Sequence, residues 1–387
     1  MSEHTISVSR TSGGIPVVVE NIPDSQSVGY MIAVATGSRD ETKDILGLSH
    51  LLEHTVFRET KTRDSYQMAK EMEGAGGEMN AFTGREMTAF YGITIRETAD
   101  VAKDLVGDIV ANPMINEKDT ELEKKIVLQE LSMIKNEPDS YIHDLFESTL
   151  WRGHALSQDE GGEEDLVRNM TSEDLRKYYE EKYRIPNLAV FAAGSADIDD
   201  TVAWAEETLD CKAGGQRNVR TAPPTPVSEY RFVKNEADHY QVAMGFPSYG
   251  ASSDDRMAVT MLSAVLGSGT SSRLFQAVRE KKALVYSGLL KEGLEKGELD
   301  RAKRLIKGAN VRAMESTEHR LYRLGVNHML NGSTESLEQR LEKIDAVTED
   351  DVMRVAEDLL RADRMNTVVL GKGARKIKNY DPSALAF

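Results

Sequence analysis

Two segments of the chain, 177 residues apart, repeat the same order of polar and apolar positions. Each begins with a Thr followed by acidic residues, at Thr171 and Thr348, which is typical of a capped helix start. Each then runs into an apolar stretch that ends at a glycine, Gly194 or Gly371. A short apolar run of this kind predicts a buried strand, so both segments predict a helix followed by a strand.

The repeat extends toward the start of each half. Residues 30–35 and 241–246 both predict a strand that leads through a polar turn into a helix. Glycines and prolines between the halves indicate a linker. We therefore predict an α + β protein with two related domains from an internal duplication, residues 1–213 and 228–387, joined by residues 214–227. Each domain is expected to hold an antiparallel-type sheet covered by helices.

One predicted helix carries His50, Glu53 and His54 in the order H-x-x-E-H. The two histidines are four residues apart, so their imidazoles share one face of the helix and can bind one metal ion. Glu53 borders that face and can reach a water molecule on the metal. This is the inverted order of the H-E-x-x-H zinc peptidase motif. The alternative is a pair of structural histidines without a metal.

A second predicted helix, residues 117–136, offers a third ligand. Glu123, Val127, Glu130 and Ile134 follow one another at spacings of four, three and four along one stripe. A catalytic zinc takes three protein ligands and keeps one position open for water. Either glutamate could supply the third ligand, and spacing alone does not separate that role from a solvated surface residue.

Taken together, these residues resemble the pitrilysin/insulysin-type (inverzincin) zinc metallopeptidases. The similarity is to the short-chain branch that includes mitochondrial processing peptidase and its bacterial and archaeal relatives. In that family a glutamate ligand follows the second histidine by 76 residues, which here is Glu130, and a further glutamate precedes it by seven, which is Glu123. The segment from Gly76 to Thr88 also matches the family pattern, and the resemblance covers nearly the whole chain.

The resemblance implies a role for each of these residues. His50, His54 and Glu130 would hold Zn²⁺, Glu53 would act as the general base, and Glu123 would orient a ligand. The family reads the backbone of an extended peptide with an edge strand, and the matching residues of this chain are Asn80, Ala81 and Phe82.

The second half carries no counterpart of the metal site, because its matching helix, residues 257–266, has no His and no carboxylate. By resemblance this half closes over the substrate, as in a clamshell, and contributes Arg279 and Tyr286, which bind the scissile carbonyl. The second half is shorter than the first by 30 residues after Tyr286, where relatives have further strands. Either this domain is naturally reduced or the sequence has been altered.

The resemblance implies a zinc-dependent endopeptidase that hydrolyses unstructured peptides or presequence-like segments inside a closed chamber. It also implies a homodimer, or a heterodimer with a related subunit. The intact H-x-x-E-H motif favours a catalytic chain, whereas the shortened second half favours the alternative, a non-catalytic or partner-dependent structural subunit of the same family.

The composition limits the binding partners and the cellular location that are expected for the chain. A net charge of −16 disfavours nucleic acid and anionic membranes as partners. No apolar run approaches the length of about 18 residues that a membrane helix needs, and the polar start is unlike a signal peptide. The single Cys211 cannot form an internal disulfide. A cytoplasmic location is therefore expected.

Overall fold

The structure is a computed structural model that describes residues 4–209, 212–277, 289–290 and 292–373. The chain forms two compact units that interleave in sequence. Unit 1 comprises Met1–Ile134, Gly153–Ala222 and Glu315–Thr334, and unit 2 comprises the remaining segments, Lys135–Arg152, Pro223–Met314 and Glu335–Phe387. The predicted α + β architecture with two related, sheet-containing parts is confirmed.

Unit 1 is built on a six-stranded sheet in the order β1-β2-β6-β3-β5-β4. Its strands are β1 (Thr5–Arg10), β2 (Pro16–Asn21), β3 (Ser27–Val34), β4 (Glu78–Thr83), β5 (Thr88–Ile95) and β6 (Leu188–Gly194). The pairs are antiparallel except for β2 and β6, which run parallel. The sheet is therefore mixed, with one departure from the antiparallel pattern expected from the sequence.

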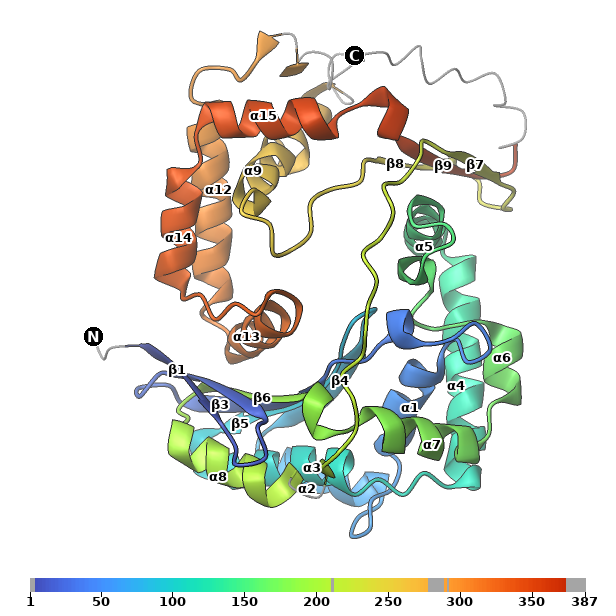
Figure 1. The fold of residues 1–387 in the computed structure, drawn as a ribbon, viewed down its shortest axis with the longest axis vertical. Helices are drawn as coiled ribbons and strands as arrows, with labels where there is room; N and C mark the ends of the chain where they lie inside the picture. Colours follow the sequence, from blue (N-terminus) through green and yellow to red (C-terminus); the bar gives the residue numbers. More distant parts are fainter. Residues whose placement is uncertain (1–3, 210–211, 278–288, 291, 374–387) are drawn as a thin grey trace. The chain divides into compact units, whose positions relative to one another are not determined.

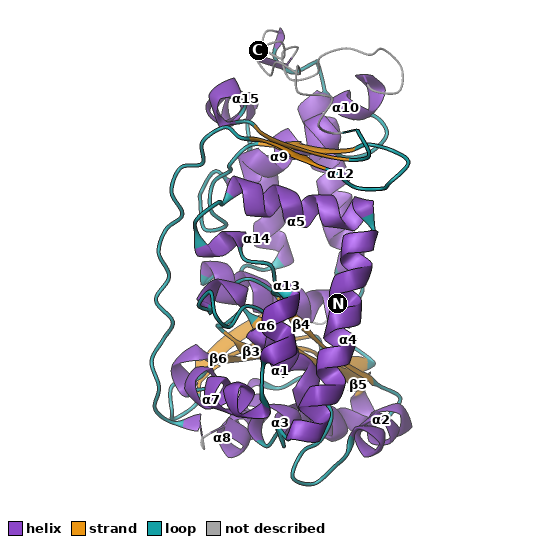
Figure 2. Cartoon of the chain, turned by 90° about the vertical axis from the view of Figure 1, so that its right-hand side faces the viewer, coloured by secondary structure: helices purple, strands orange, loops and turns teal. Residues whose placement is uncertain are grey.

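Figures 1 and 2 show the helices of unit 1, some of which begin at a capping side chain. They are α1 (Leu48–Val56), α2 (Ser65–Gly74), α3 (Ala99–Ala111), α4 (Glu117–Asn136), α6 (Glu164–Asn169), α7 (Ser172–Lys182), α8 (Ile198–Leu209) and α13 (Thr317–Asn331), with the last two residues of α4 belonging to unit 2. The predicted capping at Thr171 is present, because its side chain accepts a hydrogen bond from the backbone N–H of Asp174.

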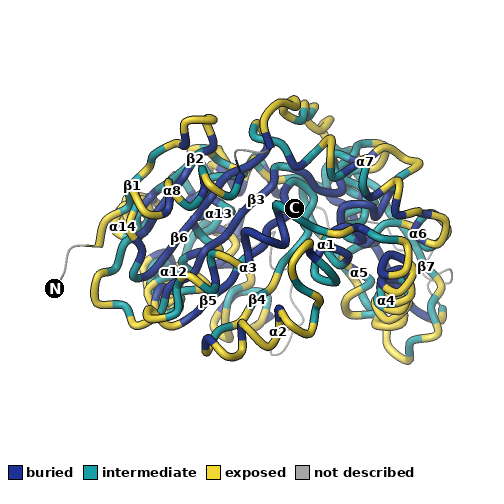
Figure 3. Tube along the Cα trace, turned by 90° about the horizontal axis from the view of Figure 1, so that it is seen from below, coloured by how far each residue is buried: buried dark blue, intermediate teal, exposed yellow. Residues whose placement is uncertain are grey.

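Alternating side chains of the central strands enter two separate apolar cores. On β3, Tyr30, Ile32 and Val34 face the larger core together with α1, α3 and α7. Met31 and Ala33 face the opposite side, where they meet α13. Both faces of these strands are therefore covered, and Figure 3 shows β3 and β6 as buried along their length.

The helix on the second face, α13, comes from the C-terminal half of the sequence. Leu321 and Leu324 are at most 1% exposed against β3 and β6. Near the edge of this contact, Glu20 of β2 is 4% exposed and is paired with Arg320 and Arg323, each at 2.7 Å. The contact combines the burial of apolar side chains with a buried carboxylate that two arginines neutralise. The helix α13 is therefore an integral part of unit 1.

Unit 2 has a smaller described sheet, in the order β7-β9-β8. Its elements are α5 (Pro138–Leu150), β7 (Tyr230–Val233), β8 (Gln241–Gly245), α9 (Arg256–Gly267), α10 (Arg273–Gln276), α12 (Glu298–Ala313), α14 (Leu337–Ala346), α15 (Glu349–Leu359) and β9 (Asn366–Leu370). The helix and strand predicted by the repeat after Thr348 are α15 and β9. Here the helix α5, from the N-terminal half of the sequence, packs on β8 and β9.

No helix in the described ranges is long and apolar enough to cross a membrane.

The carboxylate of Asp108, on α3, ties that helix to the segment that follows α1. Asp108 is 7% exposed and accepts hydrogen bonds from Thr60, Thr62, Arg63 and Asn112. Burial by itself would raise the pKa of Asp108, but these four donors outweigh it and hold the pKa below the ordinary value.

We predict that Asp108→Asn lowers the free energy of unfolding at pH 7 by about 1–3 kcal/mol, because buried donors lose a charged acceptor. A carboxyl group whose pKa is lowered by folding stabilises the protein above its unfolded pKa, about 4, and loses that effect as the pH falls through the lower folded pKa. The difference between wild type and variant in urea unfolding should therefore be constant above about pH 5 and shrink below about pH 4. Asp104→Asn, which removes a 60% exposed partner of Arg63, should cost less than about 1 kcal/mol. Equal effects of the two substitutions would contradict this account.

A second prediction concerns the contact of α13 with the sheet. Leu321→Ala should destabilise the protein by about 2–5 kcal/mol, because it opens a cavity in a fully buried contact. Leu330→Ala, on the same helix but 37% exposed, should change stability by no more than about 0.5 kcal/mol. Denaturant unfolding of both variants measures the difference, and a small effect of Leu321→Ala would show that α13 is not part of the core.

Candidate metal centre

The start of the motif helix α1 is determined by a glycine and by a buried glutamate. Gly47 precedes it with φ +98°, and a Cβ there would lie 2.7 Å from the carbonyl oxygen of Gly161, so only glycine fits. The buried carboxylate of Glu41 accepts hydrogen bonds from the backbone N–H groups of Gly47 and Ser49, at 2.8 and 2.6 Å. These bonds satisfy two donors at the helix start, where an anion is favoured.

The two faces of α1 have different roles. Leu48, Leu51, Leu52 and Val56 are buried in the larger core, in the same cluster as Val127 and Leu131 of α4. His50, Glu53 and His54 are only partly buried, on the side of the helix away from those leucines. The core therefore holds α1 and α4 together and leaves the motif residues free to face a shared site.

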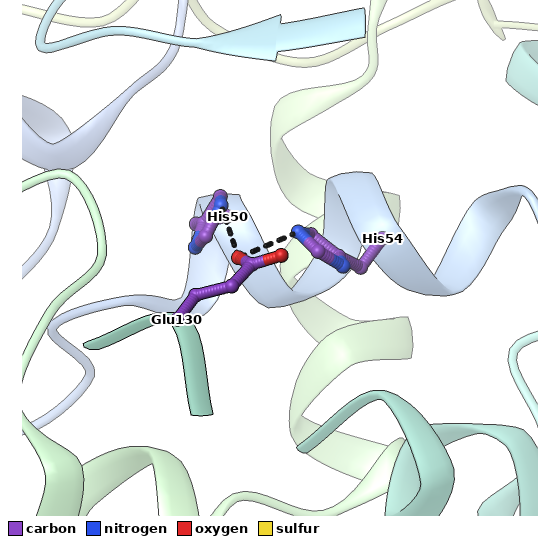
Figure 4. Close-up of side chains that lie close together, drawn as sticks. All are labelled: His50, His54 and Glu130. Atoms are coloured by element: carbon purple, nitrogen blue, oxygen red, sulfur yellow. Dashed lines mark ion pairs between the residues drawn. The ribbon is translucent and has the colours of Figure 1, made fainter. Parts of the chain in front are cut away.

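The three predicted metal ligands, His50, His54 and Glu130, lie close together (Figure 4). The Oε2 atom of Glu130 lies 3.9 Å from Nε2 of His50 and 3.5 Å from Nε2 of His54. One ligand atom from each residue lies within 4.8 Å of the others, and among the described residues this is the group of three that could hold a metal ion. The two imidazole rings are 4.7 Å apart at an angle of 81°.

The donor set fits zinc. Two imidazole nitrogens and one carboxylate oxygen are ligands that zinc takes in catalytic sites, with a position left for water. Burial, followed by the neighbouring His54, lowers the pKa of His50 to about 4, so at neutral pH its imidazole is uncharged, as a metal ligand must be.

The other glutamate of the α4 stripe, Glu123, contacts His54 on the side of the ring away from Glu130. Oε2 of Glu123 lies 3.0 Å from Nδ1 of His54, the ring nitrogen that does not face Glu130. Burial alone would lower the pKa of His54, but the bond with Glu123 and the nearby carboxylates of Glu130 and Glu53 raise it. Glu123 therefore fixes the ring orientation and favours the form of His54 with a proton on Nδ1.

Glu53 lies beside this group rather than within it. Its Oε2 accepts a hydrogen bond from the hydroxyl of Thr83 at the end of β4. Burial raises the pKa of Glu53 above the ordinary value, and the bond from Thr83 partly opposes this. A carboxylate with a raised pKa, next to a metal site, has the properties of a general base.

The strand β4 lies at the edge of the sheet, and among the described strands it pairs only with β5. Asn80, Ala81 and Phe82 therefore have an outer backbone edge that an extended peptide could pair with. A cavity of about 680 Å³ adjoins this edge. It is lined by Glu53 and His54, by Asn80 of β4, and by apolar side chains that include Phe57 and Met72.

Two predicted residues, Arg279 and Tyr286, lie outside the described residues, so their predicted role in binding the scissile carbonyl stays a prediction. The structure also brings in residues that sequence reasoning missed. Thr83 and Arg58 both contact a glutamate of the site, Glu53 and Glu123 respectively. Thr83 lies within the matched Gly76–Thr88 segment, which was its only signal, and Arg58 had none.

Comparison with known proteins places the chain in a family. Residues 16–161 match the family model described as insulinase (peptidase family M16), and residues 169–290 match the M16 inactive domain. An uncharacterized zinc protease of Streptomyces coelicolor is 31% identical over 92% of this chain and 88% of its own length. The chain belongs to the M16 peptidase family.

Other relatives of this M16 chain agree. An uncharacterized zinc protease of Bacillus subtilis is 28% identical over 90% of this chain and 94% of its own. Among solved structures, a protease from Helicobacter pylori has a TM-score of 0.87 at 20% identity, covering 95% of this M16 chain and all of the other. An M16 inactive domain from Pseudomonas fluorescens has the same TM-score at 18% identity. At these identities the solved structures show the shared fold.

We predict that the purified protein binds one zinc ion per chain after dialysis against zinc. Loss of a residue that only supports a ligand weakens metal binding by about 10–100-fold. His54→Ala and Glu130→Gln should each weaken zinc binding by more than this, because each removes a ligand. Elemental analysis and chelator competition measure this. His319→Ala, which changes an exposed histidine of α13, should bind zinc like wild type. Unchanged affinity in His54→Ala would exclude this site.

Proposed function

We propose that this chain is a zinc-dependent endopeptidase that hydrolyses unstructured peptides or presequence-like segments. The observation that carries the proposal is the meeting of His50, His54 and Glu130 at one point, with the carboxylate of Glu53 beside them. The zinc protease names of the relatives support the same activity.

In this proposal His50, His54 and Glu130 hold the zinc ion. When bound, zinc polarises a peptide carbonyl and lowers the pKa of a water molecule toward about 7. Residues of the chain orient the ligands, transfer the proton and bind the substrate. Glu123 keeps Nε2 of His54 directed at the site by its bond to Nδ1.

Glu53 moves the proton. Its carboxylate accepts a proton from the attacking water and donates it to the nitrogen of the leaving amine. The hydroxyl of Thr83 engages Oε2 of Glu53, which leaves Oε1 for the water. The outer edge of β4 at Asn80–Phe82 binds the substrate as an added strand, so that recognition rests on peptide backbone and requires an extended, unfolded substrate.

The partner and the location remain predictions from the sequence: a homodimer or a heterodimer with a related subunit, in the cytoplasm. A sizing column run with the single purified chain separates the two kinds of dimer, because only the homodimer forms without a second component.

The test is cleavage of a mixture of unstructured peptides, followed by mass spectrometry. Wild type loaded with zinc should cleave, and a zinc chelator should stop the reaction. Glu53→Gln should lower the rate by about 10²–10⁴-fold, since it removes the general base, while the zinc content stays at the wild-type level.

Glu97→Gln, an exposed glutamate of unit 1, is the matched control and should cleave normally. Cleavage that persists in Glu53→Gln would contradict the role given to that residue. Zinc binding without any cleavage by wild type would instead favour the alternative, a non-catalytic or partner-dependent subunit.

A further inference from the structure

Each carboxylate oxygen of Glu123 lies near a different side chain. Oε2 lies 3.0 Å from Nδ1 of His54, and Oε1 lies 3.4 Å from Nε of Arg58. The side chain of Glu123 is only 5% exposed, whereas that of Arg58 is 30% exposed. Arg58 therefore meets this buried carboxylate from the solvent side and supplies the opposite charge that a buried ion requires.

Arg58 comes from the end of the motif helix. The helix α1 ends at Val56, Phe57 is its C-cap, and Arg58 follows directly. Glu123 belongs to α4, so the ion pair joins the C-terminal end of α1 to the helix that also carries Glu130. Arg58 also lines the cavity beside Glu53 and His54.

The second contact restricts how the carboxylate can move. The last torsion of a glutamate side chain is broad, so a carboxylate held through one oxygen can turn about it. Arg58 forms an ion pair with the other oxygen, and this attraction disfavours turning of the carboxylate. Because Glu123 fixes the ring of His54, an arginine that fixes Glu123 also controls where Nε2 of His54 points.

We propose that Arg58 is a positioning residue for the metal centre, which acts through Glu123 on His54. The inference rests on the proposed zinc binding. It assigns Arg58 no contact with substrate or zinc.

Charge and position predict opposite effects, which makes the proposal testable. Arg58 is a cation near a site for a dication, so by charge alone its removal would strengthen zinc binding. If Arg58 positions Glu123, its removal weakens zinc binding, because residues that orient a ligand typically contribute about 10–100-fold in metal affinity.

The experiment measures the zinc affinity of the full chain by chelator competition, with circular dichroism to show that each variant is folded. Arg58→Met should bind zinc about 10-fold or more weakly, and Arg58→Lys, which keeps a donor and the charge, should recover most of that loss. Arg58→Gln gives a second, more conservative test if Arg58→Met does not fold. Arg176→Met, which removes an arginine from another ion pair of unit 1, should leave zinc affinity unchanged.

A double-mutant cycle with Glu123→Gln tests the route of the effect. If Arg58 acts through Glu123, then Arg58→Met has no further effect on zinc affinity once Glu123 is Gln, so the two losses do not add. Additive losses, unchanged affinity or stronger zinc binding in Arg58→Met would each overturn the proposal.

The outcomes separate this inference from the proposed function. Wild type that binds no zinc overturns both. Wild type that binds zinc with an affinity insensitive to Arg58 overturns the inference and leaves the zinc site intact. Peptide cleavage is not needed for either reading, because zinc affinity is the readout.

Discussion

The candidate site depends on the packing of the short helix α1 against the long helix α4. Leu51 and Leu52 of α1 and Val127 and Leu131 of α4 belong to one apolar cluster and are at most 5% exposed. Burial of such side chains is worth about 1.5–3 kcal/mol each, enough to hold two helices in a fixed relation. The polar residues near this contact then meet: His54 lies against Glu123, and Glu130 lies between the two imidazoles. One ring nitrogen, Nδ1 of His50, is buried without a hydrogen-bond partner.

The sheet of unit 1 contributes a partner for Glu53 and a strand edge beside the cavity. Its edge strand β4 brings Thr83 to Glu53 and leaves a backbone edge beside the cavity. Burial on both faces keeps the sheet rigid, with α13 closing the side opposite α1. A rigid scaffold matters because metal ligands and a general base must be held to within a fraction of an ångström.

Sequence patterns predicted the parts whose signals are local. The repeat of capped helix and apolar strand predicted α7 with β6 and α15 with β9, because caps and apolar runs depend on neighbouring residues. The spacing of the two histidines likewise required only a helix. The choice between Glu123 and Glu130 was not available from spacing, since both lie on one stripe of α4. The structure gives them distinct places, one behind His54 and one between the histidines.

Features that join distant segments could not be predicted in this way. The apolar side of α13 looks like that of any amphipathic helix, and nothing nearby in sequence shows that it covers a sheet formed some 130–300 residues earlier in the chain. Arg58 follows a helix end, where an arginine is ordinary, and its partner is 65 residues away.

Diffraction from crystals of the zinc-loaded Glu53→Gln protein, collected on both sides of the zinc absorption edge, would locate the metal ion relative to these side chains. We expect one anomalous peak per chain, about 2.0–2.2 Å from Nε2 of His50, Nε2 of His54 and a carboxylate oxygen of Glu130. Glu123 should remain on Nδ1 of His54. A zinc peak elsewhere, or one that contacts Glu123 in place of Glu130, would contradict this expectation.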